Sequence, residues 1–219
     1  GRPRAVRRSA LAELRSGFGA MRLNTALLVV VASFGLGTML AGGVDKLGLP
    51  LLMSALGAGP VGYGLMSSVF GVGMLAGGFA MGKLDVRSRY RTVMSGWLID
   101  GLLLIALGSS PNLAFALAVA VLLGLNNNVI NLPAMSLVQT GAGVENAGKV
   151  YAFWNISIWA GVSMSYVVFG PIFNAVPFRA VYAVAGLLLA GLAVLGLAAG
   201  RRIVEERPAG APGGVTAVG

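Results

Sequence analysis

Long apolar runs, separated by short polar or glycine-rich connections, dominate the pattern along the chain. A hydrocarbon core about 30 Å thick requires about 20 apolar residues in a helix, and six runs come close to or exceed that length. The predicted spans are Thr25–Gly43, Val61–Gly82, Thr92–Ser109, Leu113–Met135, Val150–Gly170 and Phe178–Gly200. A shorter run, Leu49–Gly59, is interrupted by Pro50, and it either extends the first span or lies in the interface. The pattern predicts an all-α membrane protein with six transmembrane helices.

The composition supports this fold class. Of the 219 residues, 57% are hydrophobic and 11% are charged, whereas a soluble domain is about 25% charged. The mean hydropathy is +0.84. The chain has no cysteine and no histidine, which excludes disulfides, thiolate metal sites and the commonest general base. We therefore expect no metal, no cofactor and no enzymatic activity.

The basic residues fall almost entirely on one side of the predicted spans. Of the 16 Lys and Arg residues, only Lys46 and Arg179 lie on the side opposite to the two chain ends. This split predicts that both termini are cytoplasmic, because cytoplasmic loops carry the excess of basic residues. It also explains the net charge of +9 without nucleic acid as a partner. We expect a cytoplasmic basic linker over 1–24, a six-helix bundle over 25–200 and a disordered cytoplasmic tail over 201–219.

The fourth span is unusually polar. It and the residues just after it contain Asn126, Asn127, Asn128, Asn131, Pro133 and Gln139. At 100° per residue, Asn128, Asn131 and Gln139 fall within about 80° of one another, Asn127 borders this stripe, and Asn126 points nearly opposite. Polar groups at membrane depth usually face a bundle interior or a water-filled cavity, and a proline inside a helix usually kinks it. The stripe predicts a solute cavity, with hydrogen bonding between helices as the alternative.

Other polar residues inside or beside the spans are candidates for function. Asp100 lies about 13 Å beyond Arg91 along the third span, near the midplane. Burial disfavours a charged carboxylate, so Asp100 is either a proton- or cation-binding group or a carboxyl group hydrogen-bonded to a neighbouring helix. Asn155 in the fifth span contacts either a solute or another helix. Asp45 and Lys46 follow the predicted first span on the outer side, where we expect a surface pair, with residues that guard an outer mouth as the alternative.

Glycines and charges mark the second span and its exit. Gly73 and Gly77 are four residues apart, a spacing that lets two helix backbones approach closely. It predicts tight packing inside the bundle, with a dimer face as the alternative. The next connection carries Gly82, Asp85, Arg87 and Arg89, whose charges either clamp helix ends or only set the membrane orientation. The sixth span is mostly Leu, Ala, Val and Gly, and we expect it to face lipid.

Four stretches resemble the carboxy-terminal half of major facilitator superfamily (MFS) transporters, especially bacterial drug and siderophore exporters. They are Glu13–Phe18 before Leu23 and Asn24, Gly62–Leu65, Gly82–Arg91 and Gly148–Val150. The first is similar to the linker entering the seventh helix, and the second to the eighth helix with its later glycines. The third resembles a degenerate second copy of the cytoplasmic loop motif, and the fourth the opening of the eleventh helix. The resemblance covers about residues 10–202.

This resemblance implies a six-helix MFS half with both ends cytoplasmic in a bacterial-type cytoplasmic membrane. The fourth and fifth spans would be cavity helices, which favours Asn128, Asn131 and Asn155 as solute contacts. The third span would be the usually peripheral ninth helix, which weakens the functional interpretation of Asp100. The implied activity is proton-coupled efflux of a small solute, together with a missing N-terminal half or a second copy. The alternative is a six-span subunit of an ATP-driven permease, which the short loops disfavour.

Overall fold

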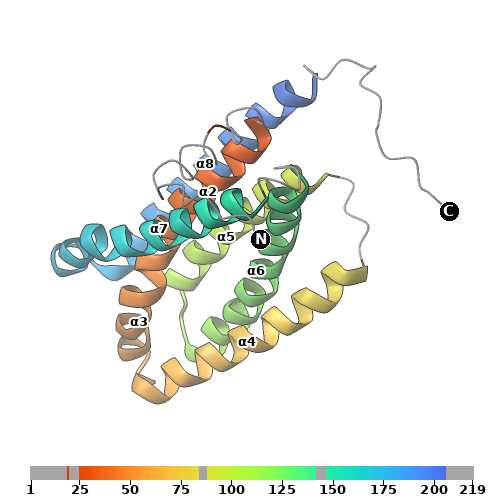
Figure 1. The fold of residues 1–219 in the computed structure, drawn as a ribbon. Helices are drawn as coiled ribbons and strands as arrows, with labels where there is room; N and C mark the ends of the chain where they lie inside the picture. Colours follow the sequence, from red (N-terminus) through yellow and green to blue (C-terminus); the bar gives the residue numbers. More distant parts are fainter. Residues whose placement is uncertain (1–18, 20–24, 84–87, 142–146, 206–219) are drawn as a thin grey trace, which may run out of the picture.

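The computed structural model describes residues 19, 25–83, 88–141 and 147–205. The elements are α2 (Thr25–Gly43), η1 (Val44–Gly48), α3 (Leu49–Ala55), α4 (Gly59–Lys83), α5 (Arg89–Gly108), α6 (Leu113–Gly141), α7 (Ala147–Ala175) and α8 (Phe178–Glu205) (Figure 1). Within the described ranges, six spans are long and apolar enough to cross a membrane. The predicted six-span, all-α fold is confirmed.

The first span is longer than the hydropathy pattern predicted. The helices α2 and α3 join through the π-helical turn η1, so one apolar span covers Thr25–Ala55. The run from Leu49 therefore extends the first span. At the other end of the chain, α8 continues to Glu205, five residues into the predicted tail. The rest of the linker over 1–24 and residues 206–219 lie outside the described residues, apart from Gly19.

Local hydrogen bonds and two glycines form the connections between spans. Gly57 (φ 69°) and Gly59 (φ 52°) turn the chain from α3 into α4 with backbone angles that other residues rarely adopt. The side chain of Ser88 caps the start of α5 by accepting from the backbone N–H of Arg91. Asn112 Oδ1 accepts from the backbone N–H of Phe115, at 2.9 Å, at the start of α6. These short connections keep successive spans antiparallel.

The packing pattern divides the bundle into two related sets of three spans. The most extensive contacts join α4 to α6, α5 to α8, α2 to α7 and α5 to α6, followed by α2 to α8. If the first, second and third spans are replaced by the fourth, fifth and sixth, and the reverse, each of these contacts becomes another contact of the same set. Because three spans reverse the direction of the chain, the two sets have opposite orientations, which is an inverted repeat.

Glycines form the closest approaches at equivalent places in the two sets. A Cβ atom at Gly73 or Gly77 would collide with the backbone of α6, and one at Gly124 with the backbone of α4. A Cβ at Gly161 of α7 would likewise collide with the backbone of α2. The predicted close packing at Gly73 and Gly77 therefore occurs inside the bundle. A Cβ at Gly82, in contrast, would meet nothing within 4 Å.

The sixth span is exposed on one face, as a lipid-facing helix would be, and packs against another helix on the other face. Helix α8 packs along α5, and Gly101 and Gly186 lie at their crossing, where a Cβ on either would collide with the carbonyl oxygen of the other. Tyr182 of α8 is fully buried. The uniform Leu, Ala, Val and Gly composition thus serves a helix–helix contact as well as lipid, since small residues allow close approach in a membrane.

Candidate solute-binding cavity

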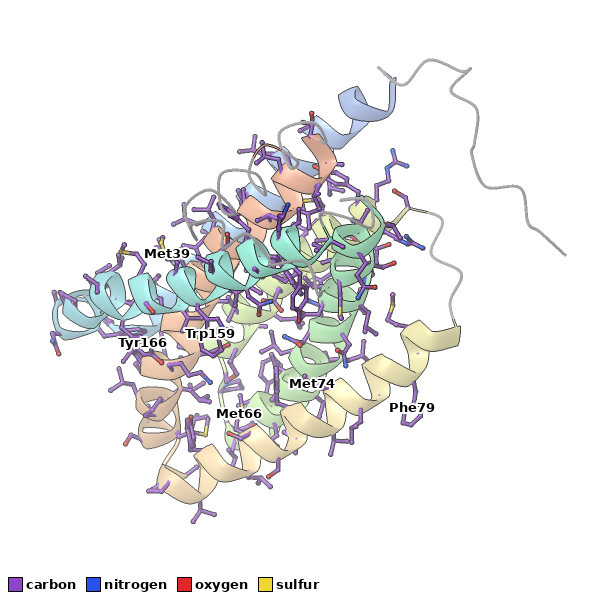
Figure 2. The ribbon with its side chains drawn as sticks, in the orientation of Figure 1. Met39, Met66, Met74, Phe79, Trp159 and Tyr166 are labelled. Atoms are coloured by element: carbon purple, nitrogen blue, oxygen red, sulfur yellow. The ribbon has the colours of Figure 1, made fainter. Side chains whose placement is uncertain are left out.

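A cavity of about 400 Å³ lies inside the bundle, between the first four spans. Its polar and charged lining consists of Thr38, Asp45, Lys46, Tyr63, Ser67, Asp100, Asn127 and Asn131. The remaining lining is mostly apolar and includes Met66, Phe70, Trp97 and Val162 of α7. In Figure 2, Met66 lies on the α4 side of this region, and Phe79 lies on the side of α4 that faces away from α6. Polar groups of four spans therefore meet in one cavity.

Helix α6 directs two of its asparagines into the cavity. Asn127 and Asn131 both belong to the lining. The Asn131 Nδ2 atom donates to the backbone carbonyl of Asn127 at 2.8 Å and to Asn127 Oδ1 at 3.1 Å. The helix continues past Pro133 to Gly141. Two amide groups one helical turn apart are therefore coupled to each other and open to a solute.

The other predicted cavity residues lie elsewhere. Asn128 Nδ2 donates to the backbone carbonyl of Met74 in α4, so this side chain links two helices. Gln139 is exposed and does not line the cavity. Asn155 also lies outside the lining, and its Nδ2 atom donates to the carbonyl of Tyr151 in its own helix at 3.1 Å. For Asn128, the structure corresponds to the alternative of interhelical hydrogen bonding.

Asp100 lies on the cavity wall. The family resemblance implied instead that its helix is peripheral. The Asp100 Oδ1 atom accepts from Asn126 Nδ2 at 3.2 Å, and the same Nδ2 donates to the Gly96 carbonyl at 2.9 Å. Asn126 is only 3% exposed. The asparagine that points away from the polar stripe is thus the hydrogen-bond partner of the intramembrane acid, and the stripe alone could not reveal it.

Asp45 and Lys46 are inside the first span, so their predicted place as a surface pair beyond it is wrong. Both belong to η1 and line the cavity. The opposite side of η1 is packed tightly, because a Cβ at Gly48 would lie 2.7 Å from the ring of Tyr182. The Tyr182 hydroxyl donates to the Val44 carbonyl at 3.4 Å. These contacts orient the turn so that its charged residues face the cavity.

An aromatic cluster of Phe34, Trp97 and Trp154 borders the cavity through Trp97. The Phe34 ring meets each indole edge-on, with ring centroids 5.3 Å apart in both pairs. Gly37 makes room for the Trp97 ring, because a Cβ there would lie 2.7 Å from it. Neither indole N–H has a hydrogen-bond acceptor among the described residues. Only Trp97 of the three lines the cavity.

The connection after the second span is only partly within the described residues. Asp85 and Arg87 lie outside them. Arg89 opens α5, and its guanidinium donates to the Thr140 hydroxyl near the end of α6 at 3.3 Å. This exposed contact joins two helix ends on the side of the basic residues. Gly82 is exposed near the end of α4.

Comparison with known proteins points the same way as this geometry. The chain is similar to an MFS-type transporter. The relative is the uncharacterised MFS-type transporter YvqJ of Bacillus subtilis (strain 168), with 28% identity over 142 residues, which cover 62% of this chain. The match covers 33% of the relative, so the chain spans about a third of that protein's length. No family model and no solved structure matches the chain.

The comparison and the fold agree on the general type of protein. Six apolar helices are what an MFS half contains. The chain is an integral membrane protein, and the similarity is to a transporter and not to an enzyme. The similarity is therefore to a protein of the transporter type, in a chain with six spans.

Proposed function

We propose that the chain forms one half of a secondary transporter that exports a small, partly apolar solute by proton-coupled alternating access. The observation that carries this proposal is the 400 Å³ cavity, in which Asn127, Asn131 and Asp100 meet at membrane depth. Its volume is within the range of about 300–1,000 Å³ for small-molecule sites. Polar groups are costly at this depth, so their convergence on an open space favours a solute site.

Asp100 is the proposed proton-binding group of this transporter. A carboxyl group inside a membrane binds a proton more readily than one in water, since the charged form loses hydration. The hydrogen bond from Asn126 holds the Asp100 carboxyl group at the cavity wall. Proton binding and solute binding would then occur in the same space, as antiport requires.

A second six-helix bundle is the proposed partner, either the missing N-terminal half of a longer chain or a second copy. In the most apolar 18-residue stretch of each span, only 17% of the residues in α4 and α7 are buried, against 39–44% in the other spans. These two helices occupy equivalent places in the inverted repeat. Large side chains such as Phe79 (75% exposed) and Trp159 (66% exposed) cover their outer faces. A second bundle packed on both would enclose the cavity between the two halves.

The proposed orientation places both chain ends in the cytoplasm of a bacterial-type cell. The charge distribution supports it, because Arg89 and Lys149 open α5 and α7 on the same side as the termini. The regions 1–24 and 201–219 are then a cytoplasmic linker and tail. The loop residues Gly82, Asp85, Arg87 and Arg89 border this face, where Arg89 links α5 to the end of α6.

The alternative of an ATP-driven permease subunit has less support. The connections from α4 to α5 and from α6 to α7 span only residues 84–88 and 142–146. Docking an ATPase requires a larger cytoplasmic surface than five-residue connections supply. The relative from Bacillus subtilis is also an MFS-type transporter by name.

Replacement of Asn131 by alanine tests the cavity in the full-length transporter. We expect Asn131→Ala to lower efflux at least about tenfold, which corresponds to about 1.4 kcal/mol, while the protein inserts normally. Efflux is measured in cells or proteoliposomes, and membrane insertion by protein level and gel filtration. Asn155→Ala is the matched control, because this residue carries the same amide outside the lining. Unchanged efflux in Asn131→Ala would rule out the cavity assignment.

A further inference from the structure

Asp45 gives the cavity a second carboxylate, from the first span, in addition to Asp100 of the third. The charge of Lys46, its neighbour on η1, acts on Asp45. The hydrogen-bond partner of Asp100 is the neutral side chain of Asn126. Lys46 also lines the cavity, but it is exposed, and its flexible side chain can extend its ammonium group towards water.

Among the lining residues, two carboxyl groups face a single ammonium group, that of Lys46. Burying an isolated charge is strongly unfavourable, so buried carboxylates bind protons or meet cations. Asp45 and Asp100 lie on different spans but border one open volume. A cationic group that enters this volume can interact with both carboxyl groups at once.

The rest of the cavity wall is suited to an apolar body. Phe70, Trp97, Leu104, Leu107, Leu123 and Ile130 supply most of the remaining surface. Such side chains bind hydrocarbon through the hydrophobic effect, and aromatic faces also attract cations. An inorganic cation would use only the aromatic faces of this wall, whereas an organic cation also uses its aliphatic surface.

We propose that Asp45 and Asp100 together bind the cationic group of an organic solute whose apolar body packs on this wall. The inference rests on the proposed transport function and names the class of solute. The π-helical turn η1 is then a positioning element, because it directs Asp45 into the cavity. Lys46, on the same turn, repels a bound cation and so lowers the affinity of the cavity for it.

Two ions of nearly equal shape and opposite charge provide the test. Tetraphenylphosphonium and tetraphenylborate are added to the purified full-length protein in a neutral detergent, and binding is measured by isothermal titration calorimetry. The cation is expected to bind at least about tenfold more tightly than the anion, a difference that reports charge and not shape. Equal or tighter binding of the anion contradicts the proposal.

Substitutions at the turn test the residues. Asp45→Asn is expected to weaken tetraphenylphosphonium binding at least about tenfold, and Lys46→Gln to strengthen it severalfold. Glu205→Gln is the matched control, since Glu205 is an acid at the end of α8, far in sequence from the cavity residues. Gel filtration confirms that each variant is folded. If Asp45→Asn does not fold, the sign of the change in Lys46→Gln still decides the question.

The outcomes separate this proposal from the transport function. If Asp45→Asn binds the cation as well as the unmodified protein, or if Lys46→Gln binds it less tightly, the assignment of a cationic solute is wrong. Loss of efflux in Asn131→Ala would then still support a solute cavity of another chemistry. If efflux survives Asn131→Ala while cation binding depends on Asp45, the transport assignment of the asparagines fails and the cation site stands.

Discussion

The helices α5 and α8 cross at Gly101 and Gly186, and the residues just before these two glycines differ. The third span has Asp100 there, whereas the sixth has Ala185, which is 1% exposed. Each glycine lets the carbonyl oxygen of the other approach, so the crossing is built in the same way from both sides. A small apolar residue is therefore sufficient for packing at this place. The carboxyl group of Asp100 is an addition to this shared packing, so the packing of the crossing alone does not account for it.

The same contrast holds between the first and fourth spans, which occupy equivalent places. The first span carries its charges on η1, whereas the fourth carries its polarity on a regular helix with Asn127 and Asn131. The close approach of each to its partner helix nevertheless depends on glycine in both cases, at Gly161 and Gly124. The inverted repeat thus fixes where helices meet, and the polar residues vary independently of it.

The largest effect on efflux is expected from Asp100→Ala, which gives the third span the alanine that the sixth span has at the equivalent position. Asp100→Ala should lower efflux by at least about a hundredfold, or about 2.7 kcal/mol, because the proposed proton-binding group is lost. The melting temperature should stay within a few degrees, since Ala185 supports the equivalent crossing. Efflux in proteoliposomes and thermal unfolding in detergent measure the two effects. A large drop in melting temperature with normal residual transport would make Asp100 a structural residue.

A smaller effect should follow from filling the crossing itself. Gly101→Val and Gly186→Val should each destabilise the protein by about 1–3 kcal/mol, because overpacking forces the backbones apart. The two losses should be similar, since the contact is reciprocal. Thermal unfolding is the measurement, and Gly71→Val is the control, because a Cβ there meets nothing within 4 Å. Clearly unequal losses of stability in the two variants would show that the two halves do not contribute equally to this crossing.

The smallest effect is expected at the asparagine that links α6 to α4. Asn128→Leu removes the hydrogen bond to the Met74 carbonyl, and such interhelical bonds contribute about 0.6 kcal/mol on average in membrane proteins. Efflux should therefore change less than about threefold, in contrast to Asn131→Ala. Dose–response measurements of both variants at equal expression make the comparison. If Asn128→Leu lowered efflux as much as Asn131→Ala does, Asn128 would have to be assigned to the solute site.

Much of the fold could be predicted from hydropathy and glycine spacing, because a membrane permits few alternatives to long helices. Hydropathy predicts that the first span ends at Gly43, because Asp45 and Lys46 are typical of the polar end of a span. The sequence alone does not show that the chain remains helical through them, since only packing against Tyr182 and the cavity makes their placement acceptable. Charges next to a functional cavity and charges at a membrane surface look alike in a hydropathy pattern.

The pairing of Asp100 with Asn126 was also missed, although a usable signal was present. Counting outward from the turn between the third and fourth spans, Asn126 lies fourteen residues after Asn112, and Gly96 lies thirteen residues before Ser109. Antiparallel neighbours place such positions at equal depth, about one turn from Asp100. Which asparagine faces the acid depends on the rotation of α6 against α5, and that rotation is set by contacts such as Ile130 against Gly96.

The π-helical turn has a consequence for how this cavity can change over generations. A π turn is equivalent to an α-helix with one extra residue, usually confined to a single turn. Deletion of one residue within Val44–Gly48 would let the first span close as a regular helix. The flanks on either side would keep their register, because the extra residue is confined to that turn, whereas the turn that holds Asp45 and Lys46 at the cavity would be lost. The charge of the binding site could therefore be gained or lost through one inserted or deleted codon, without any change in the number of spans.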